Sequence, residues 1–75
     1  MDELHRRVTR RIREIAKTRD ILVTHLPDRS DVSRSHFFDV MAGKKSPTLE
    51  WLAKIASALD VDPGELFTKS KPHRG

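Results

Sequence analysis

Apolar residues recur three or four positions apart along this chain of 75 residues, in short runs that cap and turn residues interrupt. Such spacing predicts amphipathic helices, because residues three and four apart share one face of a helix. No segment alternates polar and apolar residues as a half-buried strand would. The pattern therefore predicts a compact all-α domain of five short helices joined by tight links.

The first helix is predicted over residues 2–19, with Asp2 as its N-cap and a buried stripe of Leu4, Val8, Ile12, Ile15 and Ala16. Its opposite face carries a basic stripe, which is either a solvated surface or an auxiliary attraction to phosphate: Arg6, Arg10, Arg13 and Lys17. A second helix is predicted over residues 25–30. With Thr24 as its N-cap, Pro27 falls in the first turn, where its missing N–H does no harm.

The third helix is predicted over residues 34–42, between the N-cap Ser33 and a left-handed Gly43. The fourth follows Thr48 as N-cap, with a buried stripe of Leu49, Leu52, Ile55, Ala56 and Leu59. The fifth is short and begins with a cap at Asp62, a proline at the first helical position and a capping box completed by Glu65. Residues 1–67 are thus expected to form one domain, and residues 68–75 a flexible basic tail.

Charge and composition narrow the class of protein. Lys and Arg number 15 against 11 Asp and Glu, a net charge of +4 that suits nucleic acid, an anionic membrane or an acidic protein. The chain has no cysteine, which excludes a disulfide scaffold and a cysteine-based zinc site. No apolar run approaches the roughly 20 residues that cross a bilayer, and the charged N-terminus does not look like a signal peptide. We expect a cytoplasmic protein.

Two short helices joined by a tight turn, the second capped and followed by lysines, are typical of a helix-turn-helix. The stretch RDILVTHLPDRSDVSRSHFFDVMAGKKSPTLEWLAKIASALDVDPGELF resembles the Xre, or phage-repressor-like, helix-turn-helix domains. Its most specific segments are DVSRS, AGKKSPTLEWLAKIASAL and LDVDPGELF, and the resemblance covers about residues 8–67. It implies a five-helix, lambda-repressor-like domain that acts as a symmetric homodimer on a palindromic operator in double-stranded DNA. The sequence is similar to restriction–modification controllers and small phage regulators. The resemblance thus implies a bacterial or phage-type protein that is nucleoid-associated.

The sequence departs from the family pattern in the second helix and its turn. Leu22 and Val23 stand where the family usually has Ser or Thr followed by Gln, and Pro27 stands where Ala is usual. Asp31 stands at the turn position where the family usually has glycine. Aspartate tolerates the left-handed conformation better than most residues.

A further departure concerns a pair of charges between the first and third helices. Many family members pair an Arg late in the first helix with a Glu late in the third, and here these positions are Ala16 and Met41. Losing both charges together avoids stranding one of them in the core. This predicts an apolar contact between Ala16 and Met41.

The third helix is expected to read bases through one face. On a helical wheel Phe37, Val40 and Met41 share the core side, with His36 as a partly buried spacer at its edge. The base-reading candidates on the other side are Arg34, Ser35, Phe38 and Asp39. Arginine suits guanine, serine suits several base edges or a phosphate, phenylalanine suits a thymine methyl and aspartate accepts from cytosine N4.

Each of these assigned base contacts has an alternative. For Phe38 the alternative is burial against the second helix or against a partner molecule. Arg34 has the alternative of a surface ion pair, and Asp39 that of a pair with Arg34 or Arg29.

Phosphate contacts are expected at the two helix starts and after the third helix, from Thr24, Ser33, Lys44, Lys45 and Ser46. The dimer is expected to use the end of the chain's folded part, through Trp51, Asp60, Val61, Leu66 and Phe67. Trp51 falls outside the stripe of its helix, so it is predicted as a semi-exposed interface anchor. The alternative is that its ring lies over its own core.

An enzyme is not expected. AGKKS resembles the end of a Walker A loop, but Phe38 occupies the position of the required earlier glycine and the context is helical. The four histidines lack metal-ligand spacing such as HExxH, and no cofactor or small-molecule ligand is evident. We therefore predict a sequence-specific, dimeric DNA-binding transcriptional regulator that is repressor-like and without catalytic activity. The alternative is a protein-interaction module of antitoxin type, with DNA binding secondary; a membrane-surface role is disfavoured by the low aromatic content.

Overall fold

The computed structural model describes residues 2–68, which form four α-helices and two 3-10 helices. In chain order these are α1 (Glu3–Thr18), η1 (Val23–His25), α2 (Leu26–Ser30), α3 (Arg34–Met41), α4 (Leu49–Leu59) and η2 (Pro63–Phe67). Residues 2–68 contain no strand, so the predicted all-α class is confirmed. The predicted fifth helix is present as the 3-10 helix η2, so the count of five α-helices is not confirmed.

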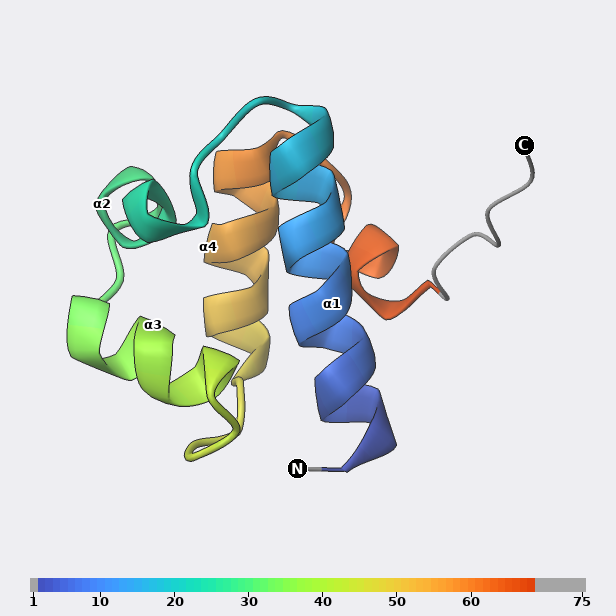
Figure 1. The fold of residues 1–75 in the computed structure, drawn as a ribbon, viewed down its shortest axis with the longest axis vertical. Coiled ribbons are helices and arrows are strands. Elements are labelled where there is room, and N and C mark those ends of the chain that lie inside the picture. The colour runs from blue at the N-terminus through green and yellow to red at the C-terminus, as the bar shows by residue number, and fades with distance from the viewer. Residues whose placement is uncertain (1, 69–75) are drawn as a thin grey trace.

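The elements surround one hydrophobic core. α2 and α3 lie to one side of α4, and η2 packs against both α1 and α4 on the other (Figure 1). The core draws on α1, α2, α3, α4 and η2 and consists of Val8, Ile12, Ile15, Ala16, Leu26, Phe37, Val40, Met41, Trp51, Leu52, Ile55, Ala56, Leu59 and Leu66. Ala16 and Met41 are both buried in this cluster, as an apolar replacement of a charge pair requires. Their direct contact stays a prediction.

Four predicted N-caps are present, at the starts of α1, α3, α4 and η2. The side chains of Asp2, Ser33 and Thr48 accept hydrogen bonds from backbone N–H groups three residues on, at 2.7, 3.3 and 3.0 Å. Each bond satisfies one of the donors that a helix leaves free at its start. The predicted capping box at η2 is absent: the Asp62 carboxylate accepts from Gly64 N–H at 2.8 Å, while the Glu65 carboxylate turns to Arg11 at 3.3 Å.

The predicted left-handed residues are also present. Asp31, in the turn before α3, has φ 57°, and Gly43 has φ 84°. After α3, Gly43 N–H donates to Val40 O at 3.0 Å and Lys44 N–H to Asp39 O at 2.8 Å, which together form a Schellman motif. Asp20 and Asp60 are left-handed as well, with φ 58° and 60°, and these two were not predicted.

Two leucines predicted to be buried are exposed. Leu4 is 51% exposed and Leu49 is 83% exposed. Each lies in the first turn of its helix, where its side chain lines the open cavity described below. At the start of α1 the buried residue is instead His5, whose Nε2 bonds the carbonyl oxygen of Val40 at 2.8 Å.

Two further expectations about side chains were wrong. Trp51 is not semi-exposed but 4% exposed, and its ring packs on Phe37 with the centroids 5.8 Å apart. Thr24 does not cap α2, because it lies within η1; α2 begins at Leu26 without a side-chain cap. Pro27 is the second residue of α2, where its missing N–H still costs no hydrogen bond. None of the described helices is long and apolar enough to span a membrane.

Candidate nucleic-acid interface

Helix α3 has a fixed rotation because its inner side is locked into the core. Phe37 and Val40 are fully buried, so the residues between them must face outward. Arg34, Ser35 and Phe38 are exposed and Asp39 is half-buried. The structure thus places all four predicted base-reading residues on the outer side of α3, which lies with α2 at one edge of the molecule (Figure 1).

Arg34, the first residue of α3, is held by three groups. Its Nη1 lies 3.4 Å from the carbonyl oxygen of Thr24 and 3.5 Å from Oδ2 of Asp28, and its guanidinium carbon lies 5.8 Å from the centroid of the Phe38 ring. Both side chains of the ion pair are more than half exposed, so the pair contributes at most about 1 kcal/mol. Arg34 can therefore exchange Asp28 for a nucleic-acid partner at little cost.

Phe38 joins the outer side of α3 to the core. Its ring meets the buried Phe37 ring edge to face, with centroids 5.1 Å apart and an interplanar angle of 85°. Phe38 nevertheless remains 38% exposed, so burial against α2 is ruled out within the monomer. The Phe38 side chain thus contacts Phe37 and Arg34 and still keeps an exposed part.

The loop after α3 carries the predicted phosphate contacts. Lys44, Lys45 and Ser46 are exposed. Nζ of Lys45 lies 3.8 Å from Oδ2 of Asp39, so Asp39 pairs with this lysine and not with Arg34 or Arg29. The N–H groups of both lysines donate to the Asp39 carbonyl, which fixes the loop close to the end of α3.

The two other phosphate candidates lie at the start of the helix-turn-helix. Thr24 and Ser33 are both exposed. The Ser33 oxygen already accepts from His36 N–H, but a hydroxyl group can still donate its own hydrogen. The Thr24 carbonyl accepts a hydrogen bond from Arg34 and so helps to position the arginine. The Thr24 hydroxyl remains the group predicted to contact a phosphate.

The predicted dimer residues do not form one exposed surface. Asp60 is exposed and lies 3.7 Å from Arg19, and Val61 and Phe67 are half-buried. Leu66 is fully buried and Trp51 is 4% exposed, so neither presents its side chain to a partner. Asp60, Val61 and Phe67 remain as candidates for a dimer contact.

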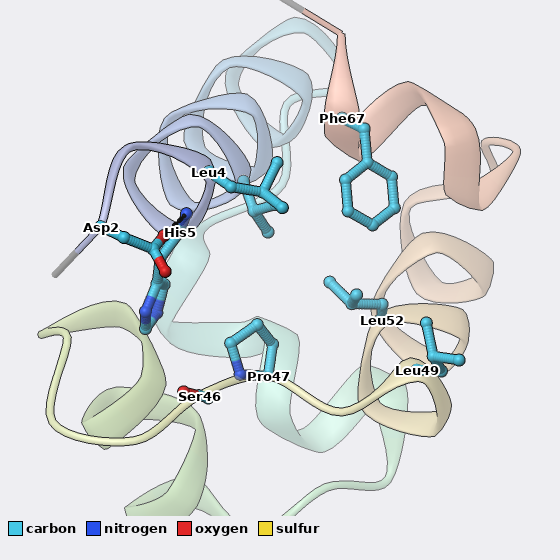
Figure 2. A pocket seen from close by; sticks show the side chains of 9 residues that line it. Asp2, Leu4, His5, Ser46, Pro47, Leu49, Leu52 and Phe67 are labelled. Carbon is cyan, nitrogen blue, oxygen red and sulfur yellow. Dashed lines mark hydrogen bonds between the residues drawn. The ribbon is translucent and has the colours of Figure 1, made fainter.

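A shallow apolar cavity of about 280 Å³ lies apart from the outer side of α3 (Figure 2). The start of α1, the loop before α4 and the end of η2 enclose it, and its lining consists of Asp2, Leu4, His5, Val8, Ser46, Pro47, Leu49, Leu52 and Phe67. Asp2 is the one residue with a full charge among these described residues, so the cavity does not suit a phosphate.

Sequence reasoning missed the partners of Arg34. The contact with Phe38 had a signal, because residues four apart on a helix are neighbours. The contacts with Asp28 and with the Thr24 carbonyl had no such signal, because the turn at Asp31 brings these earlier residues close to Arg34.

Comparisons with known proteins agree with this geometry. Residues 11–71 match the model of the Cro/C1-type HTH DNA-binding domain. The structure is similar to that of the restriction–modification controller protein C.AhdI from Aeromonas hydrophila, with a TM-score of 0.74 and 30% sequence identity over 84% of this chain and 96% of that one. A search among curated proteins gives no significant match. Family and fold are those of a DNA-binding regulator and not of an enzyme, and the chain belongs to the Cro/C1-type, Xre-like helix-turn-helix family.

Proposed function

We propose that the protein is a sequence-specific transcriptional regulator that binds a palindromic operator as a symmetric dimer, with α3 in the major groove. The observation that carries this proposal is the outer side of α3, where Arg34, Ser35 and Phe38 are exposed beside the lysine loop. A helix-turn-helix inserts the first turns of its second helix between the groove edges. Two copies of α3 in such a dimer lie about one DNA turn, or 34–36 Å, apart.

Some of these side chains read bases, and others bind phosphates and position α3. Arg34 makes a bidentate contact with O6 and N7 of a guanine, and Asp39 accepts from N4 of a cytosine. Lys44 and Lys45 bind phosphates and hold α3 in register without reading sequence. Each good bidentate contact discriminates against a wrong base by roughly 1–3 kcal/mol.

The dimer contact is proposed at the surface around Asp60, Val61 and Phe67, next to η2. Asp60 is exposed, and Val61 and Phe67 are half-buried. Asp60 and Val61 come between α4 and η2 in the chain, and Phe67 ends η2. Occupancy of the operator is proposed to follow the concentration of the protein itself or of a partner protein. Of the side chains that fit an interaction module of antitoxin type, Trp51 is buried and Phe38 is exposed. We do not propose this function, because family and fold are those of a DNA-binding regulator.

Selection from random double-stranded DNA tests the proposal. The wild type should enrich a sequence with two-fold symmetry, and Arg34→Ala should lose its preference at one position in each half-site, at a cost of roughly 1–3 kcal/mol there. Arg13→Ala, which removes an exposed arginine of α1, is the matched control and should enrich the same sequence. Absence of any enriched sequence, or an equal loss on all sequences for Arg34→Ala, would contradict the proposal.

A further inference from the structure

Arg34 and Phe38 form a cation–π pair on the first turns of α3. The guanidinium carbon lies 5.8 Å from the centroid of the Phe38 ring. A cation–π contact engages no hydrogen-bond donor, so it leaves the donors of the guanidinium to other partners. One donor atom, Nη1, faces the Thr24 carbonyl and Asp28, and a guanine would replace these exposed partners without breaking the contact with Phe38.

We propose that Arg34 and Phe38 act as one unit that reads a guanine next to a pyrimidine carrying a 5-methyl group. This inference rests on the proposed insertion of α3 in the major groove. Arg34 binds the guanine edge, and Phe38 packs on the methyl group of the neighbouring thymine or 5-methylcytosine. Phe38 is also a positioning residue, because it holds the guanidinium in place.

The spacing of the two residues fits neighbouring base pairs. Residues four apart on an α-helix are separated by about 6 Å along its axis. Base pairs in B-DNA follow one another every 3.4 Å or so. A helix lying along the groove therefore places Arg34 and Phe38 within two base pairs of each other. The contact between the guanidinium and the ring keeps the two side chains close together.

The chemistry of Phe38 selects the methyl group. A phenyl ring has no donor or acceptor, so it gains only from an apolar group on the base edge. In the major groove thymine offers its C5-methyl group, whereas cytosine offers an N4 amino donor. A 5-methylcytosine carries the same methyl group and keeps that donor. The pair should therefore respond to methylation of the DNA as well as to sequence.

The ring is held in place before DNA binds. Its edge-to-face contact with Phe37 is 5.1 Å between centroids, Phe37 is fully buried, and Phe37 in turn stacks on the buried Trp51. Three aromatic rings thus connect the core to the guanidinium. A fixed ring loses little rotamer freedom on binding, which is what a precise contact with one methyl group requires.

Changing only the methyl group tests the inference. The wild type is titrated by fluorescence anisotropy with its selected operator and with operators in which the pyrimidine beside the Arg34 guanine is thymine, uracil, cytosine or 5-methylcytosine. Uracil differs from thymine by the methyl group alone, and burial of one methyl group predicts about fourfold weaker binding for each half-site. 5-Methylcytosine should bind more tightly than cytosine by a similar factor.

Variants assign the effect to the pair. Phe38→Ala should abolish the difference between thymine and uracil and weaken the preference for guanine, and the losses from Arg34→Ala and Phe38→Ala should be non-additive. Leu4→Ala, another exposed apolar side chain, is the matched control and should keep both preferences. Thermal unfolding followed by circular dichroism checks that each variant folds.

The outcomes separate this inference from the proposed function. A guanine at the Arg34 position with no difference between thymine and uracil would overturn the inference and leave the regulator intact, as would a selected site without a thymine next to the guanine. Absence of any selected site would overturn the proposed function itself. The comparison of thymine with uracil needs only the wild type, so a variant that fails to fold does not affect it.

Discussion

His5 of α1 bonds to α3, at a residue 35 positions further along the chain. It is 8% exposed, and its Nε2 bonds the Val40 carbonyl oxygen at 2.8 Å. The same oxygen also accepts from Gly43 N–H at the end of α3, so removing the imidazole does not leave the oxygen bare. His5→Ala should therefore lower the free energy of unfolding by about 1–2 kcal/mol, the cost of one hydrogen bond and some packing, as measured by urea denaturation.

The neighbouring leucine provides the control for His5. Leu4 is 51% exposed, and Leu4→Ala should change the free energy of unfolding by less than about 0.5 kcal/mol, as for an ordinary surface change. An unchanged free energy of unfolding in His5→Ala would show that the bond to Val40 contributes nothing.

Burial at helix ends marks the limit of what residue patterns predict. Periodicity identified the core residues in the middle of each helix, including Ile12, Phe37 and Ile55. It failed for Leu4, Leu49 and Trp51, because a helical wheel gives the direction of a side chain but not what lies opposite it. Trp51 lies outside the apolar stripe of α4 and is buried by a ring of α3, which no pattern within α4 could reveal.

The turn that follows α1 contains a residue that carries conformational strain. Asp20 has φ 58°, and the next N–H, that of Ile21, donates to the Ala16 carbonyl at 2.8 Å. A left-handed residue with a Cβ costs about 1–2 kcal/mol, part of which glycine avoids. Asp20→Gly should therefore raise the free energy of unfolding by about 0.5–1 kcal/mol.

Asp20→Ala is the matched control for this prediction. Alanine has a Cβ but lacks the short polar side chain that helps aspartate adopt the left-handed region, so it should be less stable than the wild type. Urea denaturation of the three proteins should rank glycine above aspartate above alanine. Equal stability of the glycine and alanine variants would contradict the assigned strain.

The starts of α1, α3 and α4 were predictable, and the start of α2 and the end of the fold were not. Caps such as Ser33 and Thr48 are local, since one side chain bonds a backbone N–H three residues away. The same local rule predicted a capping box at Asp62, but Glu65 is drawn to Arg11 of α1, whose Nε also donates to the Glu65 carbonyl at 3.1 Å. That contact is tertiary, and η2 is a 3-10 helix and not the predicted α-helix.

At the scale of the whole molecule, the family and the outward side of α3 were predictable. The turn residue Asp31, the cap Ser33 and the buried Phe37 together set the position and rotation of α3 from local sequence. The pair with Asp28 depends on how α2 approaches α3, so the sequence assigned Arg34 its role without this partner.

The net charge of +4 and the exposed lysine loop make DNA affinity dependent on salt. Each phosphate that a lysine neutralises releases counterions and contributes about 0.9 to the slope of log affinity against log salt. Substituting both Lys44 and Lys45 by alanine should therefore flatten the slope by about 1.8 per protomer, with the preferred sequence unchanged, because phosphate contacts carry no sequence information. Lys17→Ala, an exposed lysine of α1, is the matched control and should keep the slope if the basic stripe of α1 is a solvated surface. An unchanged slope in the double variant would show that the loop lies away from the DNA backbone.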